Sequence, residues 1–500
     1  MTLPLVEELV PAPDAHAACA ALVGLPYLVF LDSATARGAS RDASRDAGGR
    51  DRYSFLAADP ALVVRCKAGR AECIDQRTAT HTPVAHNALA EIRRLLAPFQ
   101  SPSIPGLPPF QGGAAGYIAY DWGAVLERLP APRYDDLAIA DAVLGIYDCV
   151  VAWDHDTQRA WIVSTGLPDE GSARVQRAQR RLAEMRRRLA QRNGDAAAAS
   201  RAARRELGVS RAPSYPVADV GAAASIGLRS SFTHRGYLDA VTRVREYIVA
   251  GDIFQANLSQ RLEAPLRESA WSLYQRLRTV NPAPFAAYLA FDDLHVLSAS
   301  PERFLRLDDA RRVEARPIKG TRPRGIHPAH DAALGKALTD SPKDRAENLM
   351  IVDLLRNDLS RVCAAGSVRA PELFALEHYS TVHHLVSTVG GELGDGRDAI
   401  DLLMATFPGG SITGAPKVRA MEIIAELEPS RRGAYCGSIG YIALSGVMDT
   451  SIVIRTYQAI GDAVYFSVGG GIVADSDPEQ EYRETLDKAR ALIDALKASP

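Results

Sequence analysis

The segment "GSIGYIALSGVMDTSIVIRTYQAIGDAVYFSVGGGIV" (residues 437–473) decides the expected fold. Its β-branched and aromatic residues occur in short runs, and Gly, Ser and Asp separate these runs. The pattern predicts three successive strands. Three consecutive glycines, Gly469, Gly470 and Gly471, close the last strand and lead through a loop toward a helix.

The start of that final helix is marked clearly. Asp477 is the expected N-cap and Pro478 the first helical residue. Glu481 and Glu484 follow three residues apart, so both carboxylates project from one side of the helix. One interpretation is a solvated face with a Glu484–Lys488 ion pair.

The glycine run before the helix supports a different interpretation of the two glutamates. Glycines allow backbone N–H groups to approach an anion, and nearby carboxylates hold hard cations such as Mg²⁺. Glu347 is a third candidate metal ligand, although a carboxylate near a helix N-terminus is stabilising by itself. Both interpretations stay open at this level.

The chain divides into three regions by pattern. Residues 1–165 are strand-rich with frequent turn signals, and residues 142–166 are expected to form a hairpin with its turn near "DHDTQ". Residues 166–229 are expected to form an arginine-rich helix followed by a flexible linker at 192–225. Residues 230–496 carry the densest helix and strand patterns and are expected to form the catalytic region.

The bulk composition excludes several classes of protein. The 500 residues are 47% hydrophobic and carry a formal net charge of −2, which is typical of a globular protein and gives no sign of a nucleic-acid partner. The six cysteines are scattered without a CxxC pair, which argues against a zinc site or a disulfide framework and favours the cytoplasm. No signal peptide or membrane span is expected.

The stretch "RPIKGTRPRG" (residues 316–325) places Lys319 among Arg316, Arg322 and Arg324. Two interpretations are open. The loop binds acidic ligands, or the neighbouring cations lower the pKa of Lys319 and make it a usable amine nucleophile.

Two further motifs bear on the chemistry. The stretch "FPGGSITGAPK" (residues 407–417) resembles a phosphate loop but has Ala415-Pro416 where Lys-Ser/Thr is required, so nucleotide hydrolysis is excluded. Its Gly, Ser and Thr residues could still present donors to a carboxylate. His383 and His384 face opposite sides if they lie on a strand, so they cannot share one metal ion.

Together these segments resemble the chorismate-utilising enzymes, which include anthranilate, aminodeoxychorismate, isochorismate and salicylate synthases. The residues that carry the resemblance span 230–490 and include "GDIFQANLSQR", "SPERF", "PIKGTRPRG", "AENLMIVDLLRND", "HHLVSTVGG", "FPGGSITGAPKVRAMEIIAELEP" and "GGGIVADSDPEQEYRET". Within residues 1–165 the match is weaker and rests on "RYSFLAADP" and "PFQGGAAGYIAYD". The fold that the resemblance implies is α+β, with two antiparallel β-sheets packed as a sandwich and helices outside.

Two positions distinguish the subfamilies. Anthranilate synthases characteristically have Ala where this chain has Lys319, and aminodeoxychorismate synthases have Lys. Isochorismate and salicylate synthases have a water-activating lysine where this chain has Gln255. The resemblance is therefore to component I of aminodeoxychorismate synthase, which implies Mg²⁺-dependent amination of chorismate at C4.

The resemblance also implies roles for individual residues. Lys319 would be the nucleophile, Glu302 the general acid and His384 an orienting or proton-handling group. The metal would be held by Glu347 and Glu484, with Glu481 close by, while Asp344 stands where many relatives have a further glutamate. The expected substrate-binding residues are Gly320, Thr321, Tyr435, Arg455, Gly469, Gly470, Gly471 and Lys488.

The expected substrates are chorismate and ammonia, and the expected partner is a separate glutamine amidotransferase subunit that supplies the ammonia. The stretch "FLDS" matches the place where relatives hold a tryptophan, so Asp32 and Ser33 are a candidate tryptophan pocket. Two alternative functions remain. One is anthranilate synthase component I, with amination at C2 and loss of pyruvate, and the other is a non-catalytic ligand-binding protein on the same fold.

Overall fold

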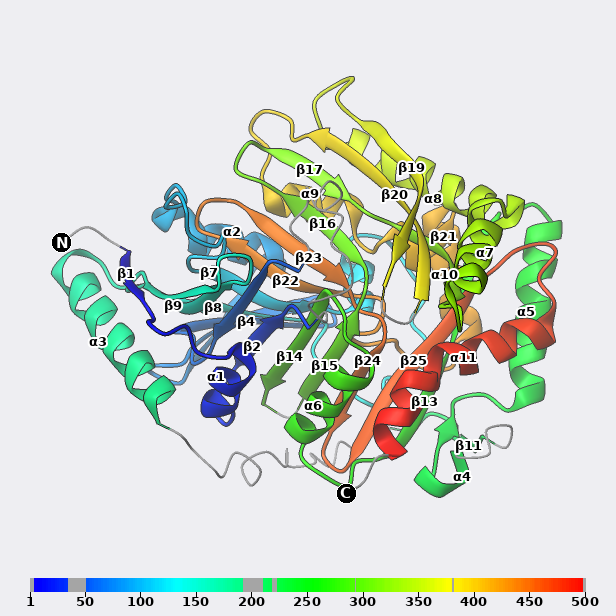
Figure 1. The fold of residues 1–500 in the computed structure, drawn as a ribbon, viewed down its shortest axis with the longest axis horizontal. Helices are drawn as coiled ribbons and strands as arrows, with labels where there is room; N and C mark the ends of the chain where they lie inside the picture. The colour runs from blue at the N-terminus through cyan, green and yellow to red at the C-terminus, as the bar shows by residue number, and fades with distance from the viewer. Residues whose placement is uncertain are drawn as a thin grey trace.

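The computed structural model describes residues 4–34, 51–191, 210–217, 223–292, 294–379 and 382–497. Two large antiparallel sheets pack face to face with helices outside, which confirms the predicted α+β sandwich (Figure 1). Most of the expected linker, residues 192–209 and 218–222, lies outside the described residues. None of the described helices is both long and apolar enough to cross a membrane.

The first sheet contains thirteen strands in the part of the chain that the structure describes. In spatial order they are β1 (Leu5–Glu8), β10 (Arg159–Ser164), β9 (Cys149–Asp154), β3 (Tyr53–Ala57), β2 (Leu28–Asp32), β14 (Phe285–Phe291), β15 (Leu294–Ser300), β24 (Thr456–Ile460), β25 (Ala463–Ile472), β13 (Gln255–Pro265), β12 (Arg229–Ser230) and β11 (Tyr215–Pro216), with β21 (Gly414–Ala415) paired to β13.

The second sheet has twelve strands within the same described ranges. Their order is β18 (Ile318–Pro323), β20 (Val382–Glu392), β17 (Arg312–Ala315), β16 (Arg303–Leu307), β23 (Met448–Ile452), β22 (Ser438–Ala443), β7 (Gly113–Ile118), β8 (Ala142–Tyr147), β4 (Leu62–Lys67), β5 (Arg70–Asp75) and β6 (Thr80–Val84), with β19 (Arg369–His378) paired to β20. Both sheets combine strands from residues 1–165 with strands from residues 230–496, so the two sequence regions share one framework.

Three hydrophobic layers hold the sandwich together. The middle layer joins the facing sides of the sheets and includes Tyr117, Tyr147 and Tyr441. The layer outside the first sheet contains side chains of α1 (Ala15–Leu22), α3 (Gly171–Ala190), α6 (Ala270–Val280) and α11 (Pro478–Lys497). The layer outside the second sheet contains side chains of α2 (Ala88–Leu96), α8 (Pro342–Ser360) and α9 (Ala399–Thr406).

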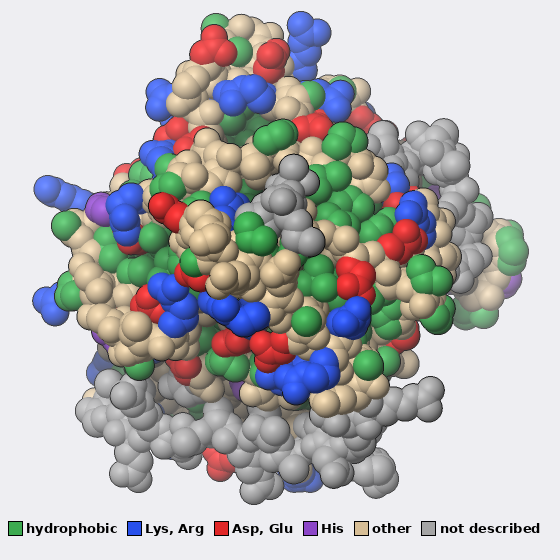
Figure 2. Space-filling model, turned by 90° about the vertical axis from the view of Figure 1, so that its left-hand side faces the viewer, with side chains coloured by type: hydrophobic (Ala, Val, Ile, Leu, Met, Phe, Trp, Pro, Cys, Tyr) green, Lys and Arg blue, Asp and Glu red, His purple; other side chains and the backbone are tan. Residues whose placement is uncertain are grey.

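The remaining helices complete the outer surface. The α5 (His234–Val249) and α10 (Lys417–Leu427) helices pack on β13, and α7 (Pro328–Thr339) packs against β18 to β20. The short helices are α4 (Ala223–Ile226) and the 3₁₀ turns η1 (Ala97–Phe99), η2 (Tyr120–Val125) and η4 (Gly410–Ile412). Basic and acidic side chains are interspersed over the face shown in Figure 2.

The C-terminal segment that opened the sequence analysis contains four strands, not three. The β22 and β23 strands belong to the second sheet, whereas β24 and β25 belong to the first. Between them the chain crosses the sandwich at Val453–Arg455, where Arg455 adopts φ +53°. Strand propensity does not reveal which sheet a strand joins, and this crossing sets Arg455 between the two sheets.

The structure also tests the local predictions made from the sequence. The hairpin with its turn near "DHDTQ" is confirmed as β9 and β10, and the final helix begins at Pro478 with Asp477 accepting from the Gln480 N–H at 2.9 Å. The helix carrying Glu347 is α8, which ends at Ser360.

Candidate functional site

A cluster of charged side chains surrounds the end of β25. A Cβ built on Gly471 would lie 3.2 Å from the Lys319 ammonium nitrogen and 2.7 Å from the Gln255 amide nitrogen. A Cβ built on Gly470 would lie 3.0 Å from Glu481 Oε2, 3.6 Å from Glu484 Oε1 and 3.8 Å from Lys488 Nζ. Side chains larger than hydrogen at these positions would therefore displace the charged groups. We call this the glycine-walled cluster, and its members are Gln255, Glu302, Lys319, Glu347, Glu481, Glu484, Lys488 and Gly469–Gly471.

The loop geometry at Gly320 brings Lys319 into the cluster. The β18 strand is an edge strand of the second sheet, and its pairing with β20 shifts register between Ile318 and Thr321. Gly320 adopts φ +85° at this irregularity, and a Cβ there would lie 2.9 Å from Asp344 Oδ1. Asp344 in turn accepts a hydrogen bond from Arg322 at 2.9 Å. Asp344 thus supports the loop that carries Lys319.

Burial is the main reason that the pKa of Lys319 is lowered. The Lys488 ammonium adds to this effect, while the carboxylates of Glu347 and Glu302 oppose it. A lysine with a lowered pKa is the type that proteins use as an amine nucleophile.

The hypothesis that the neighbouring arginines activate Lys319 is wrong. Arg316 donates to Glu377 at 2.5 Å, Arg322 to Asp344 at 2.9 Å, and Arg324 to Asp331 at 2.7 Å. Each arginine is paired with a carboxylate, and none is among the main causes of the shifted pKa of Lys319. The cation that matters is Lys488, which is 169 positions away in the sequence and could not be identified from local spacing.

Glu302 is a buried carboxyl group in the connection between β15 and β16. Burial raises its pKa from 4.5 to about 7, although a hydrogen bond from Ser411 at 2.7 Å and the charge of Lys319 act in the opposite direction. A carboxyl group with this pKa can be protonated near neutral pH and so can act as a general acid. Sequence reasoning missed Ser411, although "FPGGSITGAPK" was noted as a source of donors to a carboxylate.

A second group of residues forms a site suited to an anion. Among the described residues, no carboxylate pairs with the Arg455 guanidinium, whose pKa is lowered by burial. Burial and then the Arg455 charge lower the pKa of His384 to about 4, so its imidazole is neutral, and its Nδ1 lies 2.9 Å from the Thr321 hydroxyl. Tyr435 is buried close enough to Arg455 to affect its pKa. A partly buried cation without a carboxylate partner is suited to an anionic ligand.

The comparisons with known proteins agree with this chemistry. A family model for chorismate binding enzymes matches residues 43–494. The chain belongs to the chorismate-binding enzyme family.

Curated relatives in this family carry two different names. The chain is 42% identical over 447 residues to aminodeoxychorismate synthase component 1 of Salmonella typhimurium, covering 89% of this chain and 90% of the relative. It is 41% identical over 455 residues to anthranilate synthase component 1 of Thermus thermophilus, covering 91% of each chain. Overall identity therefore does not distinguish the two reactions.

A solved structure of the family has the same fold. Anthranilate synthase component I from Streptococcus pneumoniae superposes with a TM-score of 0.73 and 27% sequence identity, covering 88% of this chain and 92% of that one. The chorismate-binding fold of this chain therefore rests on both sequence and structural similarity.

The carboxylates predicted to hold a metal come together at the cluster. Burial raises the pKa values of Glu347 and Glu481, and the nearby charge of Glu484 adds to both shifts. Partial desolvation acts to raise the pKa of Glu484, but Lys488, which lies 2.6 Å away, lowers it. The described residues contain no group of three or more His, Cys, Asp or Glu that encloses a metal position. Mg²⁺ usually takes only one or two carboxylates from a protein, so this donor set fits Mg²⁺.

Lys343 is a further cation near these carboxylates that sequence reasoning missed. Its charge acts to lower the pKa of all three carboxyl groups. In Glu347 and Glu481 this opposes the increase caused by burial, and in Glu484 it adds to the effect of Lys488. It lies directly before Asp344 on the first turn of α8. The only sign of Lys343 in the sequence was its position shortly before Glu347 on a predicted helix.

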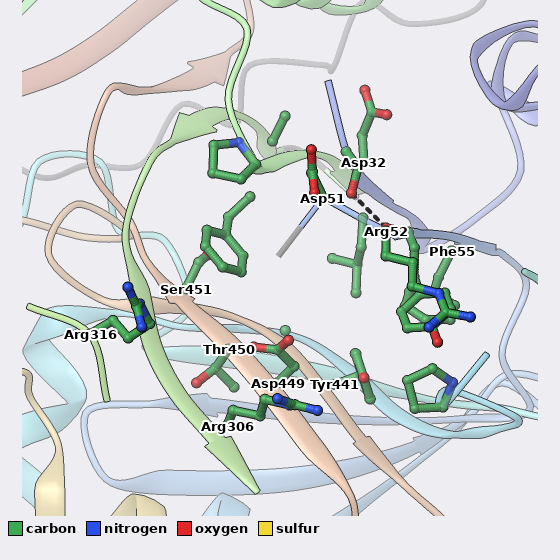
Figure 3. A pocket seen from close by; sticks show the side chains of 18 of the residues that line it. Asp32, Asp51, Arg52, Phe55, Arg306, Arg316, Tyr441, Asp449, Thr450 and Ser451 are labelled. Carbon is green, nitrogen blue, oxygen red and sulfur yellow. Dashed lines mark hydrogen bonds between the residues drawn. The ribbon is translucent and has the colours of Figure 1, made fainter. Parts of the chain in front are cut away.

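A separate cavity of about 1250 Å³ lies between the sheets (Figure 3). Asp32 and Ser33 line it, as do Phe285, Tyr441 and Ser451. The Asp32 carboxylate already accepts from Arg278 at 2.5 Å and from Tyr274 at 3.1 Å, and the Ser33 hydroxyl donates to the Tyr53 carbonyl at 2.7 Å. The lining includes no member of the glycine-walled cluster, so the two sites are distinct.

Proposed function

We propose that the protein catalyses the amination of chorismate at C4 by ammonia, giving 4-amino-4-deoxychorismate for 4-aminobenzoate and folate synthesis. The observation that carries this proposal is the presence of Lys319, with a lowered pKa, in the same cluster as Glu302, with a pKa of about 7. One supplies a neutral amine and the other supplies a proton, and both are needed to displace a hydroxyl group.

Chorismate has two carboxylates, and the site offers two groups of donors. Arg455 and Tyr435 would bind one carboxylate through charge-assisted hydrogen bonds. Lys488 and the backbone N–H groups of Gly469–Gly471 would bind the other, with Gly320 and Thr321 closing the opposite side. His384, neutral and held by Thr321, would orient the ring.

The first step is attack by the neutral Lys319 amine at C2. The C2–N bond forms, the ring double bonds shift, and the C4–O bond breaks. Glu302 donates its proton to the departing hydroxyl, which leaves as water. The lysine nitrogen is then cationic and covalently bound to the ring, and Glu302 is a carboxylate.

In the second step ammonia attacks C4 and the C2–N bond breaks. Lys319 leaves as the neutral amine that began the cycle. The new C4 ammonium loses one proton to the Glu302 carboxylate, which restores the acid. The sum is chorismate plus ammonia to 4-amino-4-deoxychorismate plus water.

Mg²⁺ is part of the proposal, with Glu347 and Glu484 as the residues that would hold it and Glu481 beside them. When bound, it would neutralise the ring carboxylate and fix its position. For Lys488 to reach that carboxylate, its ion pair with Glu484 has to open.

Relatives named component 1 imply a second component, and we propose a glutamine amidotransferase that delivers ammonia to this chain in the cytoplasm. We also propose that the cavity beside Asp32 and Ser33 takes tryptophan. Its lining combines aromatic side chains with charged ones, which suits a zwitterionic aromatic amino acid.

Anthranilate synthesis is the second candidate, because relatives with that name are equally similar. The deciding experiment incubates the purified chain with chorismate, Mg²⁺ and ammonium at alkaline pH, with and without an aminodeoxychorismate lyase. Mass spectrometry that finds 4-aminobenzoate only with the lyase supports the proposal. Anthranilate without the lyase contradicts it.

A further inference from the structure

A buried ion pair holds two segments that border the glycine-walled cluster. Arg432 and Glu428 are 3% and 5% exposed, and the guanidinium donates to both carboxylate oxygens, at 2.9 Å from Nε and 2.7 Å from Nη2. Glu428 is itself fixed to β13 by the Ser259 N–H and hydroxyl, which both donate to it at 2.8 Å. Apolar residues of similar volume often stabilise a protein as well as a buried ion pair does, so stability by itself does not explain this pair.

The remaining hydrogen bonds of Arg432 fasten the two segments to each other. Its Nη2 donates to the Asn257 carbonyl at 2.5 Å and its Nη1 to the Ile412 carbonyl at 3.0 Å. Asn257 lies on β13, two residues after Gln255 of the cluster, and Ile412 ends the 3₁₀ turn η4. The Asn257 N–H also donates to the Thr413 carbonyl at 2.7 Å. Arg432 therefore fixes the position of η4 against β13.

The η4 turn carries the serine that contacts the proposed acid. Ser411 directly precedes Ile412, and its hydroxyl donates to Glu302 Oε1 at 2.7 Å. A single 3₁₀ turn has few hydrogen bonds of its own, and no side chain caps the N-terminus of η4. The position of the Ser411 hydroxyl thus depends on the contacts that hold the turn, and Arg432 binds the residue directly after it.

The charges that act on Glu302 come from other elements. The Lys319 ammonium and a backbone N–H of β18 favour the carboxylate form, as the hydroxyl on η4 does. The Cys436 thiol lies close enough to interact with Glu302, but burial raises the pKa of this thiol to about 12, so it is neutral. The Arg432 charge is not among the main causes of the shifted pKa of Glu302. The route from Arg432 to this carboxyl group is therefore the η4 turn.

We infer that Arg432, paired with Glu428, is a positioning residue of the reaction, which holds the Ser411 hydroxyl on the carboxyl group of Glu302 and so sets how readily this acid gives up its proton. This inference rests on the proposed function, in which Glu302 is the acid. A hydrogen bond donated to a carboxylate stabilises the charged form. Without the bond from Ser411, Glu302 would be a weaker acid.

Three variants test the inference. Arg432→Lys keeps a buried positive charge beside Glu428, but a single ammonium group cannot reproduce the planar fork that spans both carbonyl groups. The double variant Glu428→Gln/Arg432→Gln removes both charges together, so it leaves no lone buried charge and serves if Arg432→Lys does not fold. Ser411→Ala removes the hydroxyl itself.

A second buried arginine–carboxylate pair provides the matched control. Arg261 donates to Asp136 at 2.8 and 2.6 Å, and the two side chains are 7% and 9% exposed. The Arg261 guanidinium also lies 5.3 Å from the ring centre of Tyr465. Arg261→Lys therefore makes the same change at a pair whose side-chain hydrogen bonds, among the described residues, do not reach η4.

For each variant, kcat/KM for chorismate is measured against pH at a constant concentration of free ammonia. The titration near pH 7 should move upward by about one pH unit in Arg432→Lys, in the double glutamine variant and in Ser411→Ala, because one hydrogen bond to a charged group has about that effect. Combining Arg432→Lys with Ser411→Ala should give no further shift, since both changes act through one hydroxyl. Arg261→Lys should leave the titration where it is.

An unshifted titration in both variants of the pair would overturn the inference. An equal shift in Arg261→Lys would overturn it too, as would a larger shift in the combined variant than in Ser411→Ala alone. The protonation of Glu302 can also be followed without any reaction, as the infrared carboxyl band that Glu302→Gln lacks.

This band separates failure of the inference from failure of the proposed function. If ammonium and chorismate give no 4-amino-4-deoxychorismate, the proposed function is wrong, whatever the band does. If the product forms and the band titrates unchanged in both variants of the pair, the positioning role of Arg432 alone is wrong and the function stands.

Discussion

The glycine-walled cluster and the large cavity differ in the surroundings of their charged side chains. In the cluster, Glu302 is buried and Lys319 is partly buried, and both have pKa values shifted toward their neutral forms. Glycine backbone packs directly against charged atoms there. In the cavity of about 1250 Å³, charged lining residues such as Arg316 and Arg324 are paired with carboxylates. Shifted pKa values, rather than the volume of a space, indicate where proton transfer takes place.

The largest expected effect comes from removing the acid of the cluster. Glu302→Gln keeps the shape but cannot donate the proton, so kcat is expected to fall about 10²- to 10⁴-fold in the ammonium-dependent assay. The matched control is Glu372→Gln, the same change in the wall of the cavity, which should stay within about threefold. Loss of activity in Glu372→Gln equal to that in Glu302→Gln would remove the distinction between the two sites.

The dependence of rate on pH sharpens the same comparison. Glu302 has to be protonated, so a group with a pKa of about 7 should govern kcat/KM for chorismate, and its deprotonation should lower kcat/KM. Lys319 has to be neutral, so protonation of Lys319 should lower kcat/KM toward acidic pH. Rates measured at a constant concentration of free ammonia test this, and a Glu302→Gln variant that keeps the titration near pH 7 would contradict the assignment of Glu302 as the acid.

Stability provides a readout that is independent of the reaction. The pKa of Glu302 rises from 4.5 in the unfolded chain to about 7 in the folded protein, so the folded state loses stability as pH rises through this window. One pKa unit corresponds to about 1.4 kcal/mol, so the carboxylate form costs about 3 kcal/mol at pH 8. Glu302→Gln should therefore raise Tm by about 3 °C at pH 8 and have little effect at pH 4.5. Differential scanning calorimetry at both pH values measures this, and equal Tm changes at the two would contradict the burial argument.

Short motifs made the cluster predictable from the sequence. Lys319, Glu302, Glu347 and the glycine run each lie in a recognisable segment, and the structure brings all of them together. Local spacing provided the Glu484–Lys488 ion pair, but it could not provide the electrostatic partner of Lys319. The arginines beside Lys319 are paired with other carboxylates, and the effective neighbour, Lys488, comes from the last helix.

The fold was predictable to the level of strands, helices and layers. The assignment of strands to sheets was not, because Val453–Arg455 and Asp148 are single short connections at which the chain passes from one sheet to the other. The cavity has the same origin. It is formed by residues from Leu31 to Ser451 that meet only after both sheets have assembled, and of its lining the sequence indicated only Asp32 and Ser33.

The smallest expected effect concerns the cavity. Tryptophan is expected to raise Tm by about 2 °C at a concentration well above its Kd, since a ligand that binds only the folded state stabilises it. Adding tryptophan should change the ammonium-dependent activity less than any of the substitutions above does. Crystals soaked in tryptophan should show density for the ligand beside Asp32 and Ser33. If no such density appears and Tm is unchanged, tryptophan does not bind there.

The most direct test of the central claim is to look for Lys319 bound to the substrate. The protein is incubated with chorismate and Mg²⁺ without ammonia, quenched, digested and analysed by mass spectrometry. The account predicts that the peptide containing Lys319 gains the mass of chorismate less one water, and that added ammonia removes this species. Amination that proceeds at full rate while no adduct forms on Lys319 would contradict it.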